Sequence, residues 1–368
     1  MVSEEKNKAY QRKRNWLTLY GLLLSFVILL SVILFRLTFL FQEWAYRITS
    51  SSYGVVFFYF LFFLMYSGLF SFPLSFYSGF VLEHQYELSN QTFFGWLWEW
   101  AKKQLLSFVI SAPLILALYA LIWHFEFNWW LFAWAGYAVF SLVLGKLFPV
   151  LIVPLFYKYS PISDETLRKR IEALASRFGI QIKNVYSLNL SKTTKKANAA
   201  FTGFGKTKRV ILGDTLLDSF THDEIETVLA HELGHYKHYD IWKQFGFGIT
   251  LSFVGFWLAF QVLNGFSEAL GYSGPADVRS FPLLCLVSFV FSLIMSPAAN
   301  AFSRYAERRA DQFALEVTHD KKSFVSAMQK LSETNLADPN PHPLIEFFLY
   351  DHPAVGKRIQ MAERFETG

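Results

Sequence analysis

The segment His231-Glu232-Leu233-Gly234-His235 carries the residue types best suited to chemistry. Two histidines four residues apart lie on one face of a helix. Imidazoles at that spacing can hold one zinc ion, and an acid directly after the first of them can take a proton from an attacking water molecule. We therefore interpret His231 and His235 as metal ligands, Glu232 as a general base, and one Zn²⁺ per chain as the expected cofactor.

The third ligand that a catalytic zinc requires must come from elsewhere in the chain. Two apolar segments, 243–264 and 281–301, follow the motif and are expected to pack as antiparallel neighbours across a short connection. A hairpin folded at Gly271 pairs residues at equal distances from it. His235 lies 36 residues before that glycine and Glu307 lies 36 residues after it. The pairing predicts Glu307 as the third metal ligand.

Other acids on the same predicted helix bear on this choice. Glu316 is a second candidate ligand, and a solvated Glu307 among neighbouring arginines is the alternative to any ligand role. Asp311 follows Glu307 by four residues and shares its helical face. It is placed to orient a ligating histidine or to take part in proton transfer.

A capped helix is expected to present the motif. Thr221 followed by Glu224 is a capping-box pattern, and the helix that starts there is expected to continue into the next apolar segment. The preceding polar block is predicted to be a small α+β unit, with a helix over 163–178 that Ser163 caps. Three strands are expected to follow, at 185–190, 199–204 and 209–212.

The composition is that of a membrane protein. Of 368 residues, 53% are hydrophobic and 17% are charged, whereas soluble chains carry about 25% charged residues. We predict a predominantly α-helical polytopic membrane protein with about six transmembrane helices and a cytoplasmic α+β zinc protease domain of the gluzincin type. The segments long enough to cross the bilayer are 16–41, 54–82, 104–125, 129–156, 243–264 and 281–301.

Basic residues set the expected orientation. They cluster near the N-terminus, in a loop with Lys102 and Lys103, and between residues 157 and 242, which places both termini and the catalytic block in the cytoplasm. The net charge of +5 has the same explanation and does not indicate nucleic-acid binding. The expected parts are a four-helix membrane region, a metalloprotease core, a helical hairpin and a cytoplasmic C-terminal part, at 1–156, 157–242, 243–301 and 302–368.

Several longer stretches resemble one family, the Ste24-type integral membrane zinc proteases of the M48 group, also called CAAX prenyl protease 1. The similarity covers most of the chain and is much more specific than the zinc motif alone. It is carried by NAAFTGF at 198–204, RVILGDTLL at 209–217, LAHELGHYKH at 229–238, SRYAERRAD at 303–311, DHP at 351–353 with Arg358, and the loop from FVLEH at 80–84 to NQT at 90–92.

The resemblance implies roles for individual residues. Glu307 would be the third zinc ligand, His352 would help to stabilise the oxyanion, and Asn198 would hold the substrate backbone. Asp311 matches the position usually assigned as proton donor, and Arg358 matches an arginine near the site. Without the resemblance, His352 is more readily interpreted as a surface histidine before a turn proline. A substrate peptide would add to the strand edge near Asn198.

The resemblance also implies partners and a location. The partners are a peptide or protein substrate, prenylated or not, and the lipid bilayer. Eukaryotic members have seven spans around a large intramembrane chamber, so six spans leave the chamber and the native substrate open. The chain has no C-terminal dilysine signal, which favours a bacterial inner membrane over the endoplasmic reticulum membrane expected of a eukaryotic member.

Three alternatives remain at this point. One is a related HtpX-like quality-control protease, although such proteins have fewer spans before the catalytic block. Another is a transporter with a structural metal site, but the predicted spans hold few ionisable residues beyond Arg36 and Lys146. A scaffold with a decayed site would not need Glu232. The basic residues from Lys192 to Arg209 are either a positive-inside surface or an attraction for a C-terminal carboxylate or anionic lipid.

Overall fold

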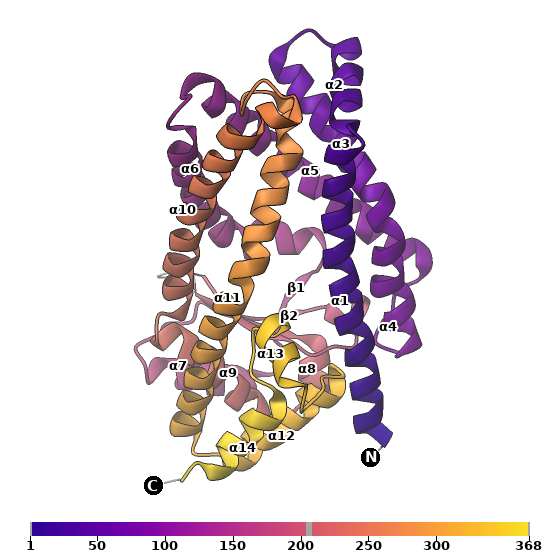
Figure 1. The fold of residues 1–368 in the computed structure, drawn as a ribbon. Helices are drawn as coiled ribbons and strands as arrows, with labels where there is room; N and C mark the ends of the chain where they lie inside the picture. The colour runs from indigo at the N-terminus through magenta and orange to yellow at the C-terminus, as the bar shows by residue number, and fades with distance from the viewer. Residues whose placement is uncertain (1, 204–207, 367–368) are drawn as a thin grey trace.

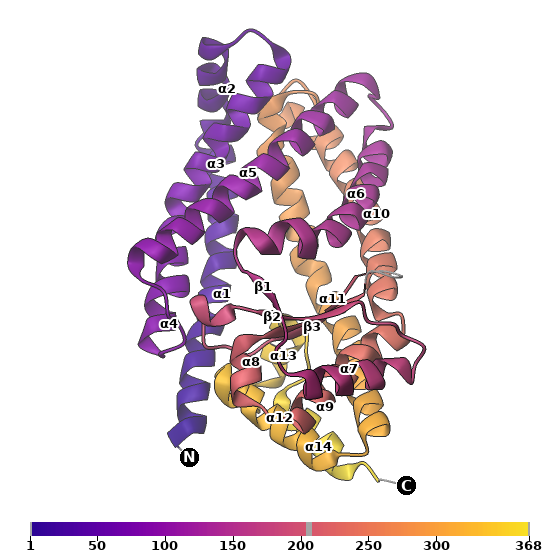
Figure 2. The same cartoon turned by 180° about the vertical axis from the view of Figure 1, so that it is seen from behind.

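Six long helices dominate the computed structural model, which describes residues 2–203 and 208–366, so the predicted positions Phe204 and Lys206 lie outside it. Six helices of the described chain are long and apolar enough to cross a membrane, which confirms the expected number of spans. A smaller part with a β-sheet lies across one end of the bundle, and both chain termini lie at that end (Figures 1 and 2).

The long helices depart from the predicted segments mainly at their ends. Lys102 and Lys103, expected in a loop, lie inside α5, which begins at Phe93 because the Thr92 side chain accepts a hydrogen bond from the backbone N–H of Gly95. The membrane-length helices are α1 (Val2–Leu34), α3 (Ser52–Phe76), α5 (Phe93–His124), α6 (Trp129–Leu147), α10 (Asp240–Phe266) and α11 (Phe281–Thr318). Short irregular turns extend α3 into α4 (Leu82–Gln85) and α6 as far as Leu155.

The first span ends earlier than the predicted residue 41. Arg36 adopts the left-handed conformation, with φ 57°, and the chain then turns into a separate helix, α2 (Leu37–Ile48). The Phe39 ring lies between two guanidinium groups, 4.8 Å from Arg36 and 4.7 Å from Arg279. These cation–π contacts hold the left-handed turn against the start of α11.

The described residues of the catalytic part form one four-stranded sheet in the order β1-β2-β4-β3. β2 and β4 are parallel, with Val185 opposite Val210, whereas β1 and β3 run antiparallel to their neighbours. The three predicted strands correspond to β2 (Asn184–Leu188), β3 (Ala199–Thr202) and β4 (Arg209–Gly213). β1 (Tyr159–Pro161) was not predicted. β3 is at the edge of the sheet, which leaves one side of its backbone free to pair with another chain.

Helices packed against the sheet and against one another complete this part. α7 (Glu165–Ser176) is capped by Asp164, whose side chain accepts from Leu167 N at 2.9 Å, and not by the predicted Ser163. The predicted capping box between Thr221 and Glu224 is confirmed at the start of α9 (His222–Lys237). The remaining helices are α8 (Asp214–Ser219), α12 (Lys321–Thr334), α13 (Pro343–Leu349) and α14 (Val355–Arg364).

The prediction that the motif helix runs on into the next span is wrong. α9 ends at Lys237, and α10 begins at Asp240 after a left-handed residue, Tyr239, with φ 58°. An uninterrupted helix would turn Asp240 about 140° away from His235 around its axis. The break instead lets Asp240 Oδ2 accept a hydrogen bond from His235 Nδ1 at 3.1 Å.

Helices α9 and α11 pack at very short range where the motif glycine lies. A Cβ atom built on Gly234 would be 2.9 Å from the Cα atom of Ala310 and 3.2 Å from its carbonyl oxygen. Both of these atoms belong to the backbone of α11, so no side chain can rotate to make room. The glycine therefore fixes how closely the motif helix approaches α11.

We expect Gly234→Ala to lower stability by about 1–3 kcal/mol, because overpacking against a backbone outweighs the better helix propensity of alanine. Thermal unfolding of the purified protein in detergent measures the effect. Gly248→Ala is the matched control, since a Cβ atom there meets nothing within 4 Å. An unchanged unfolding temperature for Gly234→Ala would contradict the close packing of α9 and α11.

Candidate metal centre and active site

Three side chains from two helices converge at the centre of the catalytic part. α9 supplies His231 and His235, and α11 supplies Glu307. One ligand atom from each lies within 4.8 Å of the other two. His231 Nε2 is 3.3 Å from Glu307 Oε2, and His235 Nε2 is 3.2 Å from Glu307 Oε1. The structure thus brings together the two motif histidines and the glutamate expected beside them.

Carboxylates behind the two histidines fix which ring nitrogens face inward. His231 Nδ1 donates to Asp311 Oδ1 at 2.8 Å, and His235 Nδ1 donates to Asp240 Oδ2 at 3.1 Å. Since an ionised carboxylate only accepts hydrogen bonds, each Nδ1 carries the proton. The Nε2 atoms of the neutral rings then turn lone pairs toward Glu307, the orientation that a metal ion requires.

These residues fit a metal ion on the chemistry of their own atoms. Two imidazole lone pairs and a carboxylate converge, so without a cation between them they would repel one another. Glu307 is 5% exposed, and its Oε2 atom is buried with no hydrogen-bond partner among the described residues. Such an orphaned acceptor is costly unless something positive binds it. Two histidines and one glutamate, with an open side, are the ligand set of catalytic zinc.

Asp311 lies behind the site and has no exposed surface. Arg358 Nε donates to Asp311 Oδ2 at 2.8 Å, and Arg358 Nη2 donates to Asp311 Oδ1 at 2.5 Å. The same guanidinium is 3.4 Å from His231 Nδ1. Of the two roles that the sequence left open for Asp311, this geometry fits the orientation of His231 and not proton transfer to a substrate.

His352 also lies beside Glu307 at the centre. Its Nε2 atom is 3.3 Å from Glu307 Oε1, and its Nδ1 atom donates to Asp351 Oδ1 at 2.8 Å. The hydrogen bond to Asp351 raises the pKa of His352 in spite of partial burial, and the charge of Glu307 acts in the same direction. The ring is 55% exposed, so the side away from Glu307 is accessible to a ligand.

The loop that carries His352 is held by α11. Arg304 Nη1 donates to the carbonyl oxygens of Glu346 and Tyr350, at 3.0 and 2.5 Å, and Asn300 Nδ2 donates to that of Phe348 at 2.8 Å. These bonds satisfy carbonyl groups at the C-terminal end of α13. The helix that supplies Glu307 therefore also sets the position of His352.

A cavity of about 250 Å³ adjoins the centre. Its lining includes six of the eight predicted site residues, namely Asn198, His231, Glu232, Glu307, His352 and Arg358, but not His235 or Asp311. Asn198 directly precedes the edge strand β3, and its carbonyl oxygen accepts from Gly213 N at 2.9 Å.

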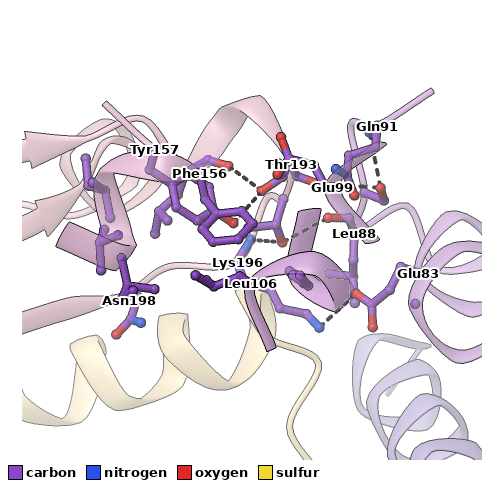
Figure 3. A pocket seen from close by; sticks show the side chains of 18 of the residues that line it. Glu83, Leu88, Gln91, Glu99, Leu106, Phe156, Tyr157, Thr193, Lys196 and Asn198 are labelled. Atoms are coloured by element: carbon purple, nitrogen blue, oxygen red, sulfur yellow. Dashed lines mark hydrogen bonds and ion pairs between the residues drawn. The ribbon is translucent and has the colours of Figure 1, made fainter. Parts of the chain in front are cut away.

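A second cavity, of about 990 Å³, adjoins the first and shares Ala197, Asn198 and Asn335 with it. It lies between the membrane helices and the catalytic part. Figure 3 shows Asn198 on one side of this cavity and Lys196 reaching toward Glu83 on the other. The loop at 80–92 that carried part of the resemblance supplies Glu83, Leu88, Ser89 and Gln91 to its lining.

The residue pattern alone did not predict two features of the site. One is Asp240, whose only sequence signal is a carboxylate five residues after His235. The other is Arg304, which is 8% exposed and was interpreted only as one of several arginines around Glu307.

Comparison with known proteins agrees with this geometry. The family model for peptidase family M48 matches residues 161–366, and that for the CAAX prenyl protease N-terminal region, five membrane helices, matches residues 3–158. The chain is 34% identical over 297 residues to the uncharacterized metalloprotease YhfN of Bacillus subtilis. This alignment covers 78% of the chain and 69% of that protein. It is 33% identical over 294 residues to the CAAX prenyl protease 1 homolog of Arabidopsis thaliana, which covers 78% of the chain and 68% of that protein.

The fold is also that of a solved structure. The crystal structure of S. mikatae Ste24p superposes with a TM-score of 0.89 at 25% identity, over 99% of this chain and 89% of that one. The likeness extends across the membrane helices as well as the catalytic part, and the metal ligands lie within the matched M48 region. The chain therefore belongs to peptidase family M48, as an integral membrane metalloprotease of the Ste24 type.

Proposed function

We propose that the protein is a zinc endopeptidase that cleaves peptides next to the cytoplasmic face of the membrane. The observation that carries this proposal is the convergence of His231, His235 and Glu307 beside a cavity that His231, Glu307 and Glu232 line. A purely structural metal site would not need an acid beside an open position. The chain's own residues thus provide metal ligands, a base and a place for a substrate.

Each residue has a distinct part in the proposed reaction. A bound zinc ion would act as a Lewis acid and lower the pKa of water toward about 7. Glu232 takes the proton from the attacking water and passes it to the leaving amine. His352 donates to the oxygen on which negative charge develops, which its raised pKa favours. Asn198 and the β3 edge hold the peptide backbone in extended form.

Asp311 and Arg358 are proposed to act through His231. Arg358 neutralises the buried Asp311, and Asp311 holds the imidazole with its Nδ1 protonated and its Nε2 free. We therefore describe Asp311 as a positioning residue. Arg358 also lines the 250 Å³ cavity.

Prenylated CAAX-type tails, or other lipidated or membrane-bound peptides, are the proposed substrates. Relatives from plants and yeast carry the name CAAX prenyl protease 1. The 990 Å³ cavity supports an apolar substrate group, since Leu106, Ile110, Phe148 and Ile152 line it beside the catalytic cavity. We propose a bacterial inner membrane as the location, with both termini in the cytoplasm, supported by the basic N-terminal segment and the similarity to a Bacillus protein.

Glu232→Gln is expected to abolish peptide cleavage while metal binding is retained. An amide cannot accept the proton from water at neutral pH, and a loss of at least about 100-fold in kcat is expected for a missing general base. Mass spectrometry of a farnesylated peptide incubated with each protein measures cleavage and identifies the cut bond. Equal product from wild type and Glu232→Gln would show that Glu232 is not the base.

Glu307→Ala is expected to lose most of the bound zinc, because one of three protein ligands is removed. Elemental analysis of the purified protein should give about one zinc per wild-type chain and much less for the variant. Glu316→Ala is the matched control, since Glu316 is an exposed residue of the same helix and bonds only to Gln312 among the described residues. Full zinc content in folded Glu307→Ala would rule out Glu307 as a ligand.

A further inference from the structure

The carboxylates that line the 990 Å³ cavity are already neutralised by lysines. Glu83 forms an ion pair with Lys196 at 2.8 Å and accepts a hydrogen bond from the Tyr10 hydroxyl. Glu99 pairs with two lysines, Lys102 at 2.8 Å and Lys192 at 2.9 Å. Neither acid is therefore available to balance further positive charge in the cavity.

Two other cations face the same cavity without a carboxylate partner. Arg14 and Lys103 both line it, and neither forms an ion pair with any described residue. The only hydrogen bond of the Arg14 guanidinium to a described residue goes to the neutral Tyr10 hydroxyl, at a long 3.4 Å. The lining thus carries uncompensated positive charge, and outside the ion pairs its other side chains are apolar or neutral and polar. Such a cavity is complementary to an anion.

Arg14 also lies where the cavities around the active site meet. It lines the 990 Å³ cavity, which shares Asn198 and Asn335 with the catalytic cavity. It lines in addition a cavity of about 490 Å³ to which His352 and Arg358 belong, and these two residues also line the catalytic cavity. The catalytic cavity therefore adjoins two cavities that Arg14 lines.

We propose that Arg14 binds the C-terminal carboxylate of the substrate peptide and so sets how near the chain end the peptide is cut. This proposal rests on the function proposed above. The terminal carboxylate is the one anion that every peptide carries regardless of its sequence. A guanidinium group can hold it through two parallel hydrogen bonds, which a neutral amide terminus cannot replace. Lys103 adds positive charge to the same cavity without lining the one that contains His352.

The test compares one peptide with a free C-terminal carboxylate and the same peptide with a C-terminal amide. For wild type in neutral detergent, we expect kcat/KM for the acid to exceed that for the amide by about 10- to 100-fold, the range for a hydrogen bond to a charged group. Arg14→Gln should reduce this ratio to near one and leave kcat/KM for the amide almost unchanged. Arg14→Lys should retain part of the preference.

Arg12→Gln is the matched control, because Arg12 is an exposed residue of the same helix and lines none of these cavities. It should keep the wild-type ratio. An equal rate for acid and amide in wild type, or an unchanged ratio in Arg14→Gln, would overturn the proposal while the protease function stands. The absence of any cleavage by wild type would instead refute the proposed function.

Two further results would assign Arg14 to a different anion. A preference for an acidic side chain near the scissile bond, kept in the amide peptide and lost in Arg14→Gln, would move the contact away from the chain end. If Arg14→Gln slowed both peptides equally in phosphatidylglycerol vesicles and had no effect in neutral detergent, Arg14 would bind a lipid phosphate. Either result overturns the role in carboxylate recognition.

Discussion

The catalytic part is organised around a buried carboxylate that faces two imidazole lone pairs. Glu307 and the Nε2 atoms of His231 and His235 repel one another unless a cation lies between them. Their approach is possible because α9 and α11 meet at Gly234 and Ala310, where a single Cβ atom would be too large. The close contact of the two helix backbones therefore brings together groups that repel one another. A bound cation would remove this repulsion, so the helix packing and the metal site depend on each other.

The same constraint explains why a membrane helix supplies a catalytic ligand. α11 runs for 38 residues without interruption, so its apolar first part fixes the direction of the polar part that carries Glu307 and Asp311. Along it, Asn300 and Arg304 hold the α13 carbonyls that precede His352. A helix packed between other membrane helices cannot rotate freely. The bundle thus positions Glu307, the proposed metal ligand, and indirectly His352, which is proposed to bind the oxyanion.

Sequence reasoning located Glu307 because counting from the hairpin depends only on two helices being antiparallel, and a helix repeats its face every three to four residues. Asp240 could not be found in this way, because its contact with His235 depends on the left-handed conformation of Tyr239. No glycine or proline in the sequence marks that break. The predicted end of the first span was wrong for a similar reason, because Arg36 is also a left-handed residue that is not glycine. Fold class and span number followed from composition and periodicity, whereas single left-handed residues that reverse or break a helix did not.

The charge balance around the 990 Å³ cavity also could not be predicted from the sequence. Lys196 pairs with Glu83 and Lys192 with Glu99, partners about 100 residues apart, so the basic stretch at 192–209 could not be divided into paired and unpaired cations beforehand. The division has a functional consequence. An edge strand such as β3 offers a peptide only backbone hydrogen bonds, which do not distinguish its sequence, and in the proposed mechanism the metal ligands act only at the scissile group. Selection of a substrate must therefore come from the cavities beside them, where an apolar wall and uncompensated positive charge lie next to each other.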